Sequence, residues 1–121
     1  MFWQKYLLVF VGGGLGSCCR LWLSTYLNVQ TKVLPWGTLA VNTLACLVLG
    51  IVIALTEKHY LPEQFRWAIG IGFCGGFSTF STFSAELLKM QQTDQFAGLM
   101  IYTFLSLVFC YVAIWLAYKV V

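Results

Sequence analysis

Long stretches without a charged side chain divide the sequence. They cover residues 33–56, 67–85 and 95–118. A helix that crosses a bilayer needs about 20 mostly apolar residues. The uncharged N-terminal stretch is shorter, but its apolar pattern continues past Arg20. The pattern therefore predicts an all-α membrane protein with four spanning helices in one domain, residues 1–121. The expected spans are about 3–26, 33–56, 66–88 and 95–118.

The composition agrees with a membrane protein. Of the 121 residues, 60% are apolar and 9% are charged, whereas a soluble domain carries about 25% charged residues. A water-soluble fold of this size could not bury so much apolar surface, and the same composition excludes disorder. The seven Lys and Arg residues are scattered, so we expect no nucleic-acid partner.

The positive charges are almost evenly divided between the two faces that four spans create. One face carries Lys5, Lys58, Arg66 and Lys119, and the other carries Arg20, Lys32 and Lys89. Orientation follows an imbalance of Lys and Arg, so two hypotheses stay open. Either the chain has one orientation, or copies insert both ways and pair antiparallel. Four helices also make a poor pathway alone, which favours a two-fold homodimer.

Two predicted spans each carry a polar stripe. The stripes are Thr38, Asn42 and Cys46 in the second span, and Tyr102, Ser106 and Cys110 in the fourth. Residues four apart share a helix face, and polar groups inside a membrane are functional candidates. A structural role is the alternative: Asn42 would bond to a neighbouring helix, and Ser106 to the carbonyl one turn back.

The third predicted span passes from four glycines into a dense run of Ser, Thr and Phe, over residues 70–84. The glycines allow close helix packing. Gly75 and Gly76, followed by Ser78 and Thr79, also indicate a helix that breaks and restarts, because glycine tolerates irregular dihedrals and Ser or Thr caps a helix. Backbone that is irregular at membrane depth lines sites, and its freed carbonyls can hold a small cation.

The Phe residues after this break recur every three positions. Phe80 and Phe83 lie on nearly one helix face, with Ser81 and Thr82 between them. Ring edges carry partial positive charge, so these rings and hydroxyls together can bind an anion weakly, as conduction requires. The alternative is contact with lipid or core. Arg20 is either a snorkelling anchor or an attractor of anions at a pore mouth.

Other chemistry is sparse. The five cysteines fall inside spans without a C-x-x-C pair, so we interpret them as small membrane-buried side chains, not as disulfides or a metal site. The four acids are Glu57, Glu63, Glu86 and Asp94. We expect none of them to find a partner within a span. Catalytic motifs are missing, so the sequence predicts no enzyme.

Three blocks carry a family resemblance. The first holds Gly12, Gly13, Gly16, Ser17 and Arg20; the second holds Pro35, Gly37, Thr38, Leu39, Val41 and Asn42; the third is residues 72–84. Together they resemble the small bacterial fluoride channels called Fluc or CrcB. Ser17, Ala45 and Ser78 replace the Ala, Gly and Thr of the family pattern.

The resemblance implies a multi-pass protein of the bacterial inner membrane that forms an antiparallel, dual-topology homodimer with two fluoride pores. Fluoride trapped in the cytoplasm would leave passively as the permeant ligand. We expect the pore to be lined by Phe80, Phe83, Asn42, Ser81, Thr82, Tyr102, Ser106 and Thr38, with Arg20 in its vestibule. The resemblance further implies a structural sodium ion on the dimer axis, held by backbone oxygens of Gly75 and Ser78.

Two other functions remain as alternatives. A dual-topology exporter of the small multidrug type also has four short spans, but its proton coupling needs an acid in the first span, and residues 1–56 contain no Asp or Glu. A membrane scaffold without transport leaves the Phe, Ser and Thr run of the third span unexplained.

Overall fold

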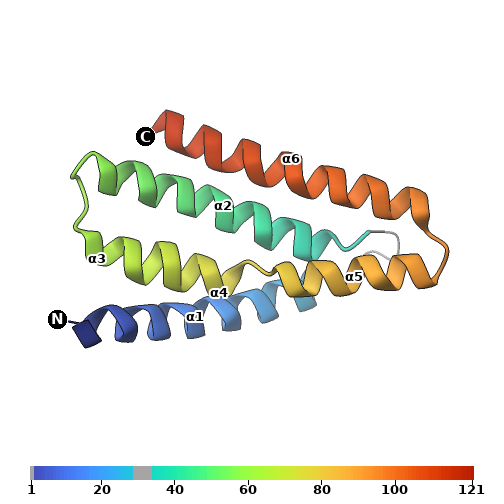
Figure 1. The fold of residues 1–121 in the computed structure, drawn as a ribbon, viewed down its shortest axis with the longest axis horizontal. Helices are drawn as coiled ribbons and strands as arrows, with labels where there is room; N and C mark the ends of the chain where they lie inside the picture. The colour runs from blue at the N-terminus through green and yellow to red at the C-terminus, as the bar shows by residue number, and fades with distance from the viewer. Residues whose placement is uncertain (1, 29–33) are drawn as a thin grey trace.

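The computed structural model describes residues 2–28 and 34–121. Their helices are α1 (Phe2–Asn28), α2 (Trp36–Glu57), α3 (Glu63–Phe65), the π-helix η1 (Arg66–Cys74), α4 (Gly75–Phe77), α5 (Phe80–Gln92) and α6 (Phe96–Val120). Figure 1 shows four roughly aligned rods: α1, then the run from α3 to α5, then α2, then α6. Both ends of the chain lie at one end of this bundle (Figure 1). Lys32 and Val33, which the predicted loop and second span include, lie outside the described residues.

Three of the described helices are long and apolar enough to cross a membrane. They are Phe2–Leu27, Trp36–Glu57 and Phe96–Val120. The third rod is divided into shorter helices, so none of its parts reaches the length of a span. The prediction of an all-helical chain with a broken third helix is confirmed. The antiparallel dimer stays a prediction.

The third rod breaks at Ser78 and Thr79. Ser78 has φ −75° and ψ 157°, and Thr79 has φ −152° and ψ 114°, so both are extended. Gly75, in contrast, is helical, with φ −64° and ψ −38°. The break falls within the predicted segment, but the idea that irregular glycine dihedrals produce it is wrong.

The glycines instead bring two backbones together. A Cβ added to Gly12 would collide with the carbonyl oxygen of Ala68, and one added to Gly76 would collide with that of Gly13. Because no side chain fits between them, α1 packs directly on η1 and α4. The π-helical geometry of η1 was not predicted from the sequence. Wide turns of this kind often occur at functional sites.

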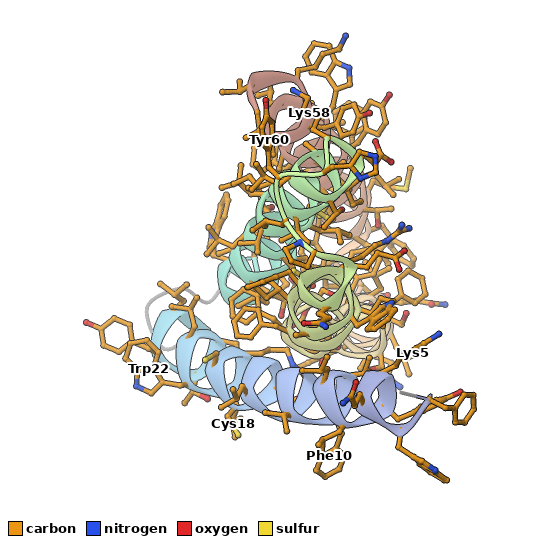
Figure 2. All side chains as sticks on the ribbon, turned by 90° about the vertical axis from the view of Figure 1, so that its left-hand side faces the viewer. Lys5, Phe10, Cys18, Trp22, Lys58 and Tyr60 are labelled. Atoms are coloured by element: carbon orange, nitrogen blue, oxygen red, sulfur yellow. The ribbon has the colours of Figure 1, made fainter. Side chains whose placement is uncertain are left out.

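The outer face of α1 is apolar and uncovered within the chain. Phe10 is 79% exposed and Trp22 is 72% exposed. Figure 2 shows that Phe10, Cys18 and Trp22 all point away from the other helices. An exposed apolar face of this kind suits lipid, since α1 is one of the spanning candidates.

Candidate functional site

Asn42 clamps the backbone at the break. Its Oδ1 accepts a hydrogen bond of 2.7 Å from the Thr79 N–H, and its Nδ2 donates one of 3.3 Å to the Thr79 carbonyl. Extended backbone inside a membrane needs such partners, because each unsatisfied polar group there costs several kcal/mol. Asn42 therefore performs the structural role that the sequence left open.

Two carbonyls lose their ordinary helical donors at this point. In a continuous helix, the Thr79 N–H would donate to Gly75 O, and the Thr82 N–H would donate to Ser78 O. The Thr79 N–H bonds Asn42 instead. The Thr82 N–H donates to Thr79 Oγ1 at 3.1 Å. The break thus turns the carbonyls of Gly75 and Ser78 away from helical hydrogen bonding.

A cluster of hydroxyls caps the restarted helix. Thr79 is the N-cap of α5, as the sequence predicted for Ser78 or Thr79. Its hydroxyl also donates to Thr82 Oγ1 at 3.0 Å and lies 3.2 Å from Ser81 Oγ. The sequence did not place Thr79 among the expected pore residues, although its position next to the break was a usable signal.

Two cavities meet at Thr79. The larger has a volume of about 450 Å³ and the smaller about 250 Å³. Of the expected site residues, the larger cavity is lined by Arg20, Thr38 and Thr82. The smaller is lined by Asn42, Ser78, Phe80, Phe83 and Ser106. Thr79 lines both, while Gly75, Ser81 and Tyr102 line neither.

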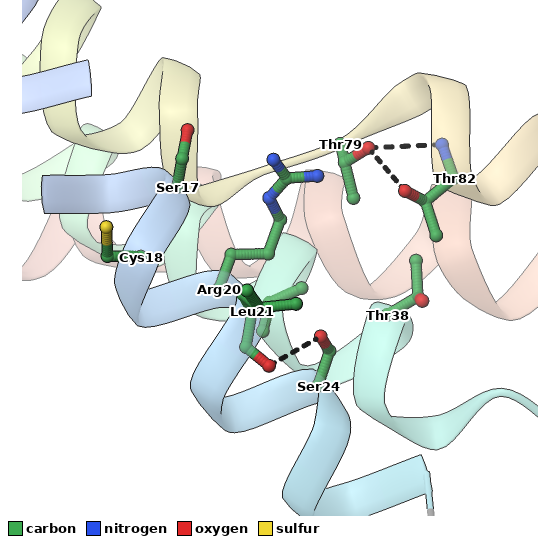
Figure 3. A pocket seen from close by; sticks show the side chains of 9 residues that line it. Ser17, Cys18, Arg20, Leu21, Ser24, Thr38, Thr79 and Thr82 are labelled. Atoms are coloured by element: carbon green, nitrogen blue, oxygen red, sulfur yellow. Dashed lines mark hydrogen bonds between the residues drawn. The ribbon is translucent and has the colours of Figure 1, made fainter. Parts of the chain in front are cut away.

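Arg20 extends into the larger cavity. Figure 3 shows its side chain reaching from α1 toward Thr79. Its Nε is buried and has no hydrogen-bond partner among the described residues. Ser17 and Ser24 line the same cavity. The guanidinium is thus set among hydroxyls with a donor to spare.

Three aromatic rings form a row beside the smaller cavity. The ring centroids of Phe80 and Phe83 are 5.7 Å apart, and those of Phe83 and Tyr102 are 5.1 Å apart, each pair tilted. Phe80 is 79% exposed, whereas Phe83 is 8% exposed. The buried Ser106 Oγ in this cavity has no partner within the described residues. It does not make the bond to a carbonyl one turn back that the sequence allowed.

Glu86 links the two polar stripes, which sequence analysis missed. Thr38 Oγ1 donates to Glu86 Oε1, and the Tyr102 hydroxyl donates to Glu86 Oε2, both at 2.6 Å. The expectation that no acid has a partner within a span is therefore wrong for Glu86. Thr38 and Tyr102 are each only 1% exposed, and charge-assisted bonds of this length are strong. A carboxylate joins α2, α5 and α6.

Sequence comparisons find relatives over most of the chain. The family model described as CrcB-like protein, Camphor Resistance (CrcB), matches residues 7–118. A protein of Phocaeicola vulgatus is 40% identical over 106 residues, covering 87% of this chain and 88% of its own. One of Rhodospirillum rubrum is 37% identical over 119 residues, covering 95% and 92%.

A protein of Leptospira interrogans is 36% identical over 121 residues, covering 95% of each chain. All three relatives are named fluoride-specific ion channel FluC. The family match over residues 7–118 includes the break and both polar stripes. The chain is a multi-pass membrane protein without enzymatic activity, and it belongs to the CrcB family.

Proposed function

We propose that the chain is a fluoride-specific ion channel through which cytoplasmic fluoride leaves passively. Relatives that match most of the chain carry that name. One structural observation supports the proposal most directly. Two buried polar atoms without partners, Arg20 Nε and Ser106 Oγ, lie in two cavities that share Thr79.

These cavities define a path for an anion. Arg20 draws fluoride into the larger cavity by its charge. In that cavity Thr82, whose oxygen accepts the Thr79 proton, supplies a hydroxyl, and Thr79 lines both cavities. In the smaller cavity, the Ser106 hydroxyl and the edges of Phe80 and Phe83 replace water. Among the described residues, no Lys or Arg lines the smaller cavity, so binding there stays weak enough for fluoride to leave.

Hydrogen bonds to Glu86 determine which hydroxyls can donate to fluoride. The hydroxyls of Thr38 and Tyr102 donate their protons to its carboxylate. These two side chains therefore orient the carboxylate and do not donate to fluoride. The hydroxyls of Ser106 and Thr82 are then the donors along the path. This assignment gives different tasks to residues that the sequence grouped together.

The same proposal includes an antiparallel dual-topology homodimer with two pores. The smaller cavity is bounded by Phe80, whose ring is 79% exposed within the chain, and a second copy would complete that wall. Four helices alone do not surround a polar path. A near-even distribution of Lys and Arg between the two faces permits insertion in both orientations.

A structural sodium ion on the dimer axis completes the proposal. The carbonyls of Gly75 and Ser78 fit it, because their helical donors bond elsewhere and backbone oxygens suit a hard cation. Gly75 also has open space where a Cβ would stand. Sodium would neutralise the carbonyl dipoles at the centre of the membrane and hold the two broken helices together.

Ion efflux from liposomes tests the function. Purified protein is reconstituted with internal potassium fluoride, and efflux is followed with a fluoride electrode after valinomycin is added; a parallel sample contains chloride. Rapid fluoride efflux that depends on valinomycin, with little chloride efflux, is the expected result. A folded protein that passes no fluoride contradicts the proposal, and cation-export assays would then test the multidrug-type alternative.

A further inference from the structure

Two cysteine side chains from different helices meet in the wall of the smaller cavity. Cys46 lies on α2 and Cys110 lies on α6, and these two helices pack against each other. Both line the cavity beside Asn42 and Ser106. They are free cysteines. The permeation path proposed above uses neither thiol, and nothing in the sequence pairs two residues so far apart.

We propose that Cys46 and Cys110 together bind a soft, thiophilic metal cation such as Hg²⁺, and that filling this site obstructs the smaller cavity. Sulfur ligands select soft metals, and Hg²⁺ favours two sulfur ligands in a line. Among the described residues, no three His, Cys, Asp or Glu side chains gather into a group. The pair therefore suits a two-coordinate ion, not a tetrahedral zinc site.

The binding step is an exchange of protons for metal. Two S–H bonds and the two Hg–Cl bonds of mercuric chloride break, two S–Hg bonds form, two protons and two chloride ions leave, and no electron is transferred. The product of two thiolates and one divalent cation is neutral, which avoids the cost of a net charge within the membrane. Mercuric chloride is itself uncharged, so it reaches the thiols through lipid as well as through the cavity.

The obstruction, though not the binding, rests on the proposed fluoride channel. Asn42 and Ser106 line the same cavity as the two thiols, and Leu107 lies on it as well. A mercury atom bridging the thiols occupies space in a cavity of about 250 Å³. Fluoride efflux should then slow without any loss of the folded protein.

The test uses full-length protein in which Cys18, Cys19 and Cys74 are replaced by Ala, so that only the pair remains. Mercuric chloride is added, bound mercury is counted by native mass spectrometry, and free thiols are counted after denaturation. The expected result is one mercury per chain, both thiols lost, and fluoride efflux slowed until an excess of a small dithiol removes the metal. The matched control carries Cys110→Ala in addition.

Several outcomes overturn the proposal. They are mercury held by one thiol only, equal slowing in the control, loss of both thiols without retained mercury (which indicates disulfide formation), and full occupancy with unchanged efflux. If the triple variant does not fold, peptide mapping of the mercury in the unaltered chain gives the same decision. Absence of fluoride efflux before mercury is added contradicts the channel instead, and the stoichiometry still decides the metal site.

Discussion

Asn42 and Thr79 are joined through two hydrogen bonds between one amide side chain and one peptide unit. The pair fixes the extended segment of the third rod against α2. It also orients the cap of α5 and releases the Gly75 carbonyl. The interruption of the helix is therefore held in place from outside the helix.

Asn42→Ala should destabilise the protein, because it leaves the Thr79 N–H and carbonyl without partners, at about 1–3 kcal/mol each. Asn42→Asp keeps an acceptor for the N–H but adds a negative charge beside the path, so it should suppress fluoride efflux more than it lowers stability. Thermal unfolding in detergent and liposome efflux separate the two effects. Thr103→Val is the control, since its hydroxyl donates to Leu99 O within α6 itself. Unchanged efflux in Asn42→Asp would remove Asn42 from the path.

Phe80→Ile should slow fluoride efflux with little change in stability, because the Phe80 ring is 79% exposed within the chain. Phe83→Ile should slow efflux and also lower stability, since its ring packs against Tyr102. The matched control is Phe10→Ile, whose ring is equally exposed but points away from the other helices (Figure 2). Normal conduction in both Phe80→Ile and Phe83→Ile would contradict an aromatic pore.

Tyr102→Phe should lower stability by about 1–3 kcal/mol, because it removes one donor from a partly buried carboxylate. In a Glu86→Ala background the same substitution should cost far less. The coupling in this double-mutant cycle should be at least about 0.5 kcal/mol, as expected for residues in contact. Tyr111→Phe, at an exposed position, serves as control. Additive effects of Tyr102→Phe and Glu86→Ala would show that the hydrogen bond contributes nothing to stability.

Gly12→Ala should be destabilising by about 1–3 kcal/mol, the range typical of overpacking, because its Cβ would collide with the Ala68 carbonyl. Gly14→Ala should be neutral or stabilising by up to about 1 kcal/mol, since nothing lies within 4 Å of its Cβ. Both substitutions lie on α1, so their unfolding temperatures compare packing alone. Equal temperatures would mean that α1 and η1 are not in backbone contact.

Replacing sodium with N-methylglucamine on both sides of the membrane should reduce fluoride efflux, and restored sodium should recover it. Ser78→Ala should keep this dependence, because the proposed ligand is the backbone carbonyl and not the hydroxyl. Fluoride efflux in carefully sodium-depleted liposomes provides the measurement. Efflux that is indifferent to sodium would contradict the site at Gly75 and Ser78.

The parts of the fold that depend on local spacing could be predicted. Stripes at intervals of four residues placed Asn42 and Ser106 on faces that do line one cavity. The run of glycines followed by Ser and Thr placed the break within a few residues. That the break begins at Ser78 and not at the glycines could not be predicted. The sequence does not show that Gly76 is needed for contact with the Gly13 backbone.

Contacts between segments that are far apart in the sequence could not be predicted. Glu86 accepts hydrogen bonds from Thr38 and Tyr102, which lie 48 and 16 positions away from it in the sequence. The position of its carboxylate depends on the direction in which α5 restarts. A lone acid near the end of a predicted span carried no signal of this. Thr79 was likewise not singled out among the neighbouring Ser and Thr residues. Its role follows from the hydrogen bond between its backbone and Asn42.

The π-helix over Arg66–Cys74 gives the third rod slack in chain length. A wide turn behaves as an extra residue accommodated within an α-helix. Losing one residue there would restore ordinary turns and leave the parts on either side with the same faces toward α1. Gly76 would then still face Gly13, where no side chain fits between the two backbones. In the regular helix α2, by contrast, a deletion would rotate everything downstream by about 100°, so a single deletion should be tolerated better in the π-helix than in α2.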